Sequence, residues 1–201
     1  MTRTTLATLL ATALLTGAGC ATTDHEMSEH GMSDHGMSGE ELPMVGGAAM
    51  YPTKDIVENA SESADHTTLV AAVQAAGLVE TLQGDGPFTV LAPTNAAFAK
   101  LPAGTVDTLL LPENKETLAS ILTCHVIAAR AMSSDVVGMI ADDGGAHEVG
   151  TVGPCKLVAK SSGGTVTFTD ENGNVATVTQ ADVVQSNGVI HVVDTVLLPR
   201  Q

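Results

Sequence analysis

The chain has 201 residues, and 23 acidic against 8 basic side chains give it a formal net charge of −15 and a pI near 4.5. A chain this acidic repels nucleic-acid backbones, and with no Trp, one Tyr and three Phe it lacks the rings that stack on bases, so we expect no nucleic-acid partner. Its length fits one ordinary domain with extensions, and its core must be built from aliphatic side chains.

The segment 1–19 has the composition of an export signal. Arg3 is followed by a ten-residue apolar run that ends at Leu15, and small residues then precede Cys20. A membrane-spanning helix needs roughly 20 apolar residues, so we expect none here. The small residues before Cys20 resemble the bacterial lipoprotein signal and predict lipidation of this cysteine, although Gly17 stands where that signal usually has Leu. The alternative is ordinary signal cleavage, which would leave Cys20 as a thiol or disulfide partner in a soluble secreted protein.

Residues 20–50 are predicted to form a disordered acidic tether. Between Ala21 and Met50 there are six acidic residues, no Lys or Arg, and no apolar periodicity. Within this segment, a five-residue repeat places a histidine two residues before a methionine three times. The pairs are His25 and Met27, His30 and Met32, and His35 and Met37.

The His-x-Met spacing is typical of copper ligands. In an extended chain, residues i and i+2 project to the same side, so each pair presents an imidazole and a thioether to one point. Thioethers select Cu(I), and imidazole accepts Cu(I) or Cu(II). The repeat is similar to the Met/His-rich segments of bacterial envelope copper-handling proteins, and it predicts copper or silver binding. The alternative is a low-complexity spacer that holds no metal.

The remaining residues, 51–201, carry 7 basic and 17 acidic side chains and are predicted to form one folded domain. An apolar i, i+3, i+4 pattern predicts a helix from Leu69 to Val79, which Gly77 breaks or ends. Phe88–Leu91 is typical of a buried strand, and the helix expected after it, 95–100, can be capped by Thr94.

The second half of this domain is predicted to be made of strands. Alternating β-branched residues indicate strands at 165–169, 175–179, 183–185 and 189–193. Asn-Gly turns lie between the first and second of these strands and between the third and fourth. Helices followed by strands, rather than strict alternation, indicate an α+β fold.

Two segments of this domain resemble the signature blocks of the fasciclin family. They are Gly86–Pro102, G-P-F-T-V-L-A-P-T-N-A-A-F-A-K-L-P, and Ser186–Pro199, S-N-G-V-I-H-V-V-D-T-V-L-L-P. Both lie where that family has them, and Leu122–Ile127 takes the place of its Tyr-His segment. The resemblance covers nearly all of 51–199. It implies a wedge of two small β-sheets flanked by a bundle of short helices, and a role in adhesion or interaction outside the cytoplasm.

The resemblance also bears on two histidines. It implies that His191 is a hydrogen-bonded core residue. In animal relatives the Tyr-His segment has been linked to cell adhesion, which makes His125 a candidate for partner binding. However, Cys124 stands where the Tyr belongs, and a structural role for His125 is the alternative.

Cys124 and Cys155 are predicted to form a disulfide. If Cys20 carries lipid, they are the remaining pair of cysteines in a compartment that oxidises thiols. Both lie in segments that we expect to be strands. The alternative is two separate buried thiols.

The motifs of common enzymes are missing from the sequence. It has no G-x-S-x-G, H-E-x-x-H, C-x-x-C, P-loop or dinucleotide fingerprint, so we expect neither catalysis nor a required cofactor. Asp142 and Asp143 precede two glycines and favour a turn over a Ca²⁺ site, and we interpret His147 and Glu148 in the same way.

Together these patterns predict a lipoprotein anchored to a bacterial membrane by lipid alone, facing the periplasm or the exterior. Its folded domain is expected to act as an adhesion or interaction module for an unidentified protein or a cell-surface or matrix component. The competing hypothesis is copper binding and buffering by the tether. A third is a structural envelope protein without a discrete ligand.

Overall fold

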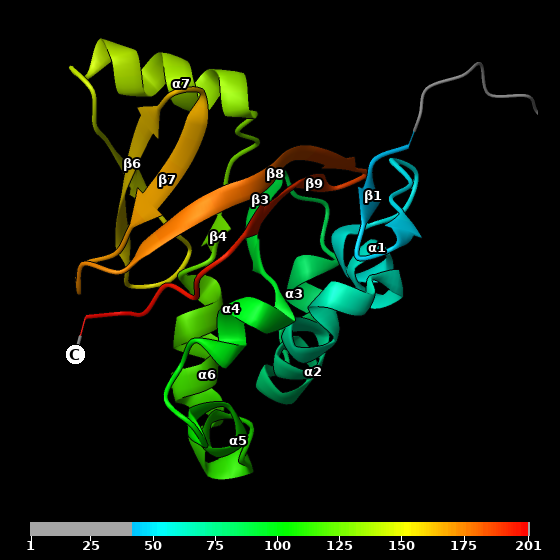
Figure 1. The fold of residues 1–201 in the computed structure, drawn as a ribbon. Coiled ribbons are helices and arrows are strands. Elements are labelled where there is room, and N and C mark those ends of the chain that lie inside the picture. Colours follow the sequence, from blue (N-terminus) through cyan, green and yellow to red (C-terminus); the bar gives the residue numbers. More distant parts are fainter. Residues whose placement is uncertain (1–41, 201) are drawn as a thin grey trace, which may run out of the picture. The chain divides into compact units, whose positions relative to one another are not determined.

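The computed structural model describes residues 42–200 (Figure 1). Its α-helices are α1 (Ile56–Glu62), α2 (Thr67–Ala76), α3 (Val79–Leu82), α4 (Asn95–Ala99), α5 (Thr105–Leu109), α6 (Lys115–Thr123) and α7 (Ser133–Asp142). Two short 3-10 helices are η1 (Ala64–His66) and η2 (Pro112–Asn114). The strands are β1 (Met44–Val45), β2 (Ala48–Ala49), β3 (Phe88–Pro93), β4 (Val126–Ile127), β5 (His147–Gly150), β6 (Lys156–Ser162), β7 (Thr165–Thr169), β8 (Val175–Gln185) and β9 (Gly188–Val193).

The main sheet has seven strands in the order β4-β3-β9-β8-β7-β6-β5. Only β3 and β9 pair in parallel among these neighbours. The long strand β8 pairs with β7 through its first residues and with β9 through the rest, and its register shifts between Val178 and Val183. Because such bulges bend a strand, β8 divides the sheet into two smaller ones that share it. The predicted α+β class and the wedge of two small sheets are confirmed.

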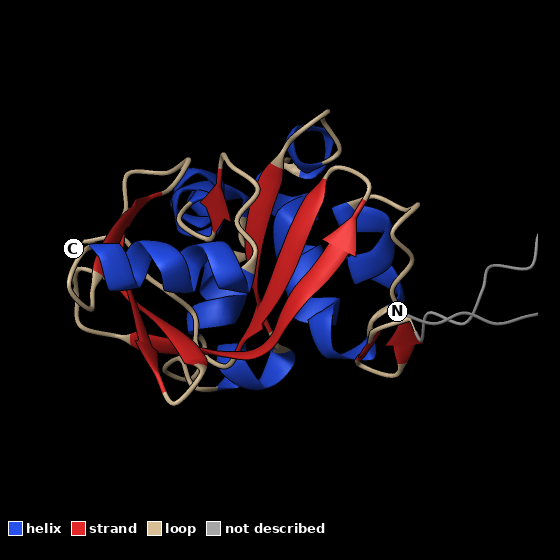
Figure 2. Ribbon diagram, turned by 90° about the horizontal axis from the view of Figure 1, so that it is seen from above, coloured by secondary structure: helices blue, strands red, loops and turns tan. Residues whose placement is uncertain are grey.

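Strands β3 and β9 lie at the centre of the fold and are buried on both faces. Val90 and Ile190 point into a core made with helices α1 to α4 and α6. Leu91 and Val193 point into a second core made with β6, β7 and helix α7. Strands covered on both faces are apolar throughout, which explains why these two segments lack alternation. Helices accordingly lie on both sides of the central strands (Figure 2). Among residues 42–200, no helix is long and apolar enough to cross a bilayer.

The folded region begins earlier than the expected boundary at residue 51. Strands β1 and β2 form a hairpin, and Val45 and Met50 are only 5% and 2% exposed. Gly46, with a φ of +56°, allows the turn, and a Cβ there would lie 2.4 Å from Ser63 Oγ. The prediction of a disordered tether is therefore wrong for these residues, because two apolar side chains are buried against the helices. Residues 20–41 of the predicted tether lie outside the described residues.

The local predictions for two helices are confirmed. Helix α2 ends at Gly77, which adopts a left-handed conformation with a φ of 71°. Helix α4 begins after Thr94, whose side-chain oxygen accepts a hydrogen bond of 3.2 Å from the Ala97 N–H.

Candidate functional site

The residues predicted to carry lipid and metal lie outside the described part of the chain. They are Cys20, His25, Met27, His30, Met32, His35 and Met37. The lipid anchor and the copper site therefore stay predictions. In residues 42–200, no three His, Cys, Asp or Glu side chains come together as a metal site.

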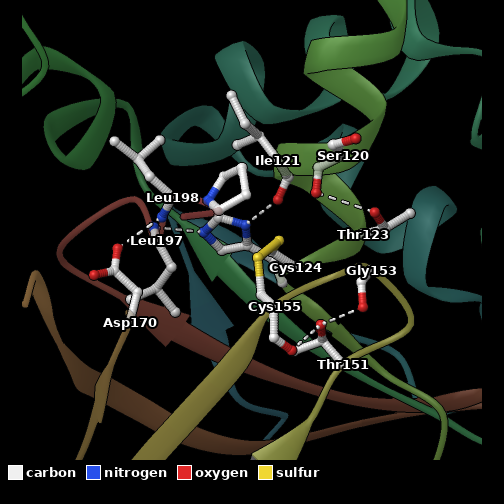
Figure 3. Close-up of a disulfide and its surroundings, with 12 residues drawn as sticks. Ser120, Ile121, Thr123, Cys124, Thr151, Gly153, Cys155, Asp170, Leu197 and Leu198 are labelled. Atoms are coloured by element: carbon white, nitrogen blue, oxygen red, sulfur yellow. Dashed lines mark hydrogen bonds between the residues drawn. A yellow bond between two sulfur atoms is a disulfide. The ribbon is translucent and has the colours of Figure 1, made fainter. Parts of the chain in front are cut away.

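Cys124 and Cys155 form a disulfide, and both are buried (Figure 3). Their Cα atoms lie 5.3 Å apart, and 31 positions separate them in the chain. The expectation that both lie in strands is wrong. Cys124 ends helix α6, since its N–H donates to Ser120 O at 3.2 Å, and Cys155 directly precedes β6. The disulfide thus joins the helical half of the fold to the strands of the second core.

His125 directly follows Cys124 in the chain and is 2% exposed. Its Nε2 accepts a hydrogen bond of 3.0 Å from the Leu197 N–H, so the proton of the neutral ring is on Nδ1, which donates to Ile121 O at 2.8 Å. Burial lowers the pKa of His125 to about 4. The proposal that this imidazole contacts a partner is wrong, because both of its nitrogens are used inside the core. Its role is to join α6 to the C-terminal segment.

His191 is a core residue, as predicted. Its Nδ1 accepts from the Asp182 N–H at 3.2 Å, and its Nε2 donates to Ala131 O at 2.9 Å. Burial lowers the pKa of this imidazole. Since His125 and His191 each use both nitrogens in main-chain hydrogen bonds, neither can take a proton from a substrate without breaking a core contact.

Asp182 was not anticipated from the sequence. It has a φ of 59° in the bulged part of β8 and is the one non-glycine residue of the described chain with positive φ. Its carboxylate accepts from the Ser133 N–H at 2.7 Å and from the Ser133 hydroxyl, at the first residue of α7. An acidic residue that interrupts the apolar pattern of a strand was the available signal, and its contact links β8 to α7.

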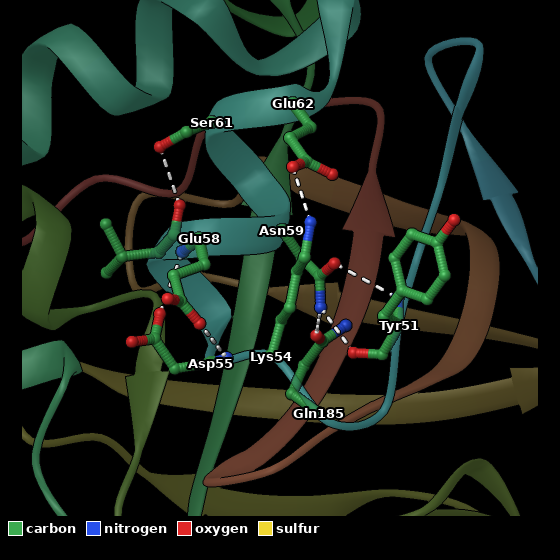
Figure 4. A network of polar contacts seen from close by, with 9 residues as sticks. Tyr51, Lys54, Asp55, Glu58, Asn59, Ser61, Glu62 and Gln185 are labelled. Atoms are coloured by element: carbon green, nitrogen blue, oxygen red, sulfur yellow. Dashed lines mark hydrogen bonds and ion pairs between the residues drawn. The ribbon is translucent and has the colours of Figure 1, made fainter. Parts of the chain in front are cut away.

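On the helical side, Asn59 joins separate segments of the chain as Asp182 does, and it is fully buried (Figure 4). Its Oδ1 accepts from the Tyr51 N–H at 3.0 Å, and its Nδ2 donates to Tyr51 O at 2.8 Å and to Gln185 Oε1. This network joins the N-terminal segment and α1 to the end of β8. The buried amide satisfies main-chain groups and leaves no atom directed at a ligand.

The turn between α7 and β5 was predicted, but the contact that it creates was not. Asp143 follows α7, and His147 begins β5. The Nδ1 atom of His147 lies 2.5 Å from Asp143 Oδ2. Because a carboxylate only accepts, the Nδ1 atom carries a proton, and in the neutral ring Nε2 is left as an acceptor.

Similarities to a family model, to related proteins and to solved structures all point to the fasciclin domain. The Fasciclin domain model matches residues 64–199. Protein sll1483 of Synechocystis sp. is 46% identical over 164 residues, which is 80% of this chain and 82% of that protein. The cell surface glycolipoprotein MPB83 of Mycobacterium bovis is 39% identical over 122 residues, or 61% of this chain and 48% of that protein. A solved FAS1 domain pair from the insect cell adhesion molecule Fasciclin I has a TM-score of 0.63 and 18% identity, covering 73% of this chain and 51% of that chain, and shows the likeness of fold.

Proposed function

Since this chain belongs to the fasciclin-domain family, we propose that it is a cell-envelope lipoprotein whose folded domain acts as an extracytoplasmic adhesion or interaction module. Two of the similar proteins are named as a cell surface glycolipoprotein and a cell adhesion molecule. The observation that carries the proposal is the use of the domain's signature residues. His125 and His191 are both used in hydrogen bonds inside the core, so neither is available for catalysis. We therefore assign the domain a binding role, and we place the binding site on its surface.

Lipidation of Cys20 would hold the module at a bacterial membrane, facing the periplasm or the exterior. Membrane fractionation of cells that produce the full-length chain tests this part. We expect the protein in the membrane fraction, and we expect Cys20→Ser to release it into the soluble fraction. An unchanged distribution of the Cys20→Ser chain would contradict the anchor, and wild-type protein that is already soluble would favour simple secretion.

The interaction itself can be tested with beads that carry the full-length Cys20→Ser chain. We expect them to adhere to whole cells or matrix components, and we expect a chain lacking residues 24–37 to adhere equally well. Adhesion of beads coated with the chain after denaturation should be lost. If the deletion abolishes adhesion, or native and denatured chains adhere alike, the folded domain is not the interaction module.

A second candidate function is copper binding, and the three His-x-Met pairs are the observation that favours it. A Cu(I) competition titration of the Cys20→Ser chain should give sub-nanomolar effective affinity that disappears when residues 24–37 are removed. A matched variant that replaces Met27, Met32 and Met37 with Leu keeps the acidic charge and the imidazoles. It should lose Cu(I) affinity while retaining weaker Cu(II) binding. Equal affinities in all chains would leave the repeat as a spacer.

A further inference from the structure

The two edge strands of the main sheet, β4 and β5, face the same cavity. It has a volume of about 210 Å³ and is lined by residues of both edge strands together with the loop 128–131, α7 and the inner strands β3, β7 and β9. The chain closes the gap between the edges at one end, where the N–H of Val152 donates to Val126 O at 2.7 Å. Protein cores contain few voids larger than a water molecule, so a cavity of this size is a distinct feature of the fold.

The buried polar side chains that line the cavity, Thr89 and His191, are already hydrogen-bonded within the protein. Thr89 donates from its hydroxyl to Ala129 O at 2.6 Å and accepts from the Ala131 N–H at 2.9 Å. His191 uses both of its nitrogens as described above. The other buried lining side chains are apolar, among them Phe168, which is 1% exposed. A polar group placed here would be desolvated without a side-chain partner, so an apolar group suits the interior of the cavity.

The volume limits the size of that apolar part. An engineered protein cavity of about 150 Å³ binds benzene. By this scale the present cavity accommodates an aromatic ring or a short alkyl chain of roughly six to nine non-hydrogen atoms. Two lining residues, Met139 on α7 and Val149 on β5, are half-buried, and Ala129 in the loop 128–131 is exposed, so the cavity opens between these three segments.

The polar group at the mouth is His147. It lines the cavity, its side chain is 26% exposed, and Asp143 holds its Nδ1 proton. The other charged residue at the mouth, Glu148, is paired with Lys156 at 2.8 Å. In its neutral form, the ring of His147 provides a hydrogen-bond acceptor, Nε2, close to the carboxylate of Asp143. This arrangement suits a group that donates a hydrogen bond and disfavours a carboxylate.

We propose that this cavity binds a small molecule that combines an aromatic ring or short alkyl chain with a hydrogen-bond-donating head, an alcohol or a primary ammonium. The apolar part fills the space between the edge strands, and the head donates to His147 at the mouth. This binding site is separate from the proposed adhesion function and does not depend on it.

The head-group preference can be tested with three probes that share one ring. The full-length Cys20→Ser chain is labelled with ¹⁵N and titrated at pH 8 with benzylamine, benzyl alcohol and benzoate, and amide shifts are followed. We expect the amine and the alcohol to shift the amides of Ala131, Val149 and Phe168 with a Kd on the order of 1 mM, as suits ligands of this size. Benzoate should bind about tenfold more weakly, because its carboxylate can only accept hydrogen bonds and is repelled by the carboxylate of Asp143. Equal binding of all three, or shifts elsewhere only, would overturn the proposal.

Filling the cavity should abolish the binding. Val149→Phe places a larger side chain in the cavity on a strand that tolerates aromatic residues, and should weaken benzylamine binding about tenfold or more. The matched control is Val175→Phe at a position that is 49% exposed and outside the cavity, which should bind normally. If Val149→Phe does not fold by circular dichroism, Met139→Phe fills the same cavity from α7. A folded filled variant that binds with unchanged affinity refutes the site.

A separate variant tests the role of His147. His147→Leu keeps the cavity apolar and removes the acceptor at its mouth. We expect it to bind benzyl alcohol several-fold more weakly while its affinity for toluene, which has no head group, stays unchanged. Parallel losses for both probes, or none for benzyl alcohol, would show that His147 does not receive the head group.

Discussion

The two faces of the β3–β9 strand pair are covered in different ways. On one face, Val90 and Ile190 pack against five helices, most of them consecutive in the chain, and the gaps beside them have volumes of about 40 Å³ and about 10 Å³. On the other face, Leu91 and Val193 pack against strands and the single helix α7, and the 210 Å³ cavity is left beside them. The second face is held by contacts between distant residues, including the disulfide, His125 and Asp182. The packing of the second face thus depends more on one disulfide and a few hydrogen bonds between distant residues. The packing of the helical face depends more on apolar contact area.

Breaking the disulfide should cause the largest loss of stability, and this loss should be greatest on the second face. In the chain-entropy model, a loop of 31 residues accounts for about 3 to 4 kcal/mol of stability. Urea unfolding of the paired Cys124→Ala and Cys155→Ala chain, compared with wild type, measures the loss. Native-state hydrogen exchange should show faster opening of β6, β7 and α7 than of α2. Equal acceleration in α2 would contradict the distinction between the two faces.

Acid should destabilise the protein through its buried histidines. The pKa of His125 is lowered to about 4 by burial, against about 6.5 in the unfolded chain, and burial lowers the pKa of His66 and His191 as well. As the pH falls below 6.5, the unfolded state takes up protons first, so stability present at neutral pH is lost progressively down to pH 4.

For His125 this loss is about 3 kcal/mol, and urea unfolding at several pH values measures it. A His125→Gln chain, less stable at pH 7, should show a shallower decline between pH 6.5 and 4. An identical pH dependence in both chains would contradict the contribution of His125.

Removing the Asn59 side chain tests the helical face. Asn59→Ala deletes the partner of the Tyr51 N–H and carbonyl and of Gln185, which should cost about 2 kcal/mol because buried polar groups are left unsatisfied. Asn172→Ala, which removes exposed side-chain hydrogen bonds near the C-terminus, is the control and should cost less. Hydrogen exchange should accelerate in α1 first. Acceleration confined to α7 would argue against this assignment.

The smallest expected effect comes from Asp182. Asp182→Ala removes the acceptor of the Ser133 N–H at the start of α7 and should cost about 1 to 2 kcal/mol, comparable with the loss of a helix cap. Asp182→Asn keeps an acceptor oxygen and tolerates the left-handed backbone, so it should lose less. Thermal unfolding of both chains makes the comparison. If Asn and Ala are equally harmful, the charge of the carboxylate matters more than the hydrogen bond.

Some features of the fold could be predicted because a few neighbouring residues decide them. Gly77 ends α2 through its own backbone conformation, and Thr94 caps α4 through an N–H three residues away. The alternation of apolar and polar residues in 165–169 is likewise a local property, and it predicts strand β7 with the bounds that the structure has. The hairpin before residue 51 was missed although Gly46 and Gly47 mark its turn, because the burial of Val45 depends on helices later in the chain.

The candidate site was predicted less completely. Pairing Cys124 with Cys155 needed only the number of cysteines, the assignment of Cys20 to lipid and the expected compartment. The helical position of Cys124 did not follow from its apolar neighbours. The resemblance to a family suggested a buried His191, whereas His125 remained ambiguous. Its hydrogen bond comes from Leu197, 72 positions away, and decides that the ring is internal.

The sequence by itself determined the α+β class, the positions of helix α2 and strand β7, the resemblance to a family and the repeat of His and Met residues. These properties depend on local propensity, on periodicity, or on long motifs that can be read in order. Only the tertiary structure decided that His125 is inaccessible, that Asp182 reaches α7, and that β4 and β5 enclose a cavity with His147 at its mouth. The reason is physical: burial, hydrogen-bond partners and empty volume depend on which distant segments meet, and the bend of β8 brings the two edges of one sheet together.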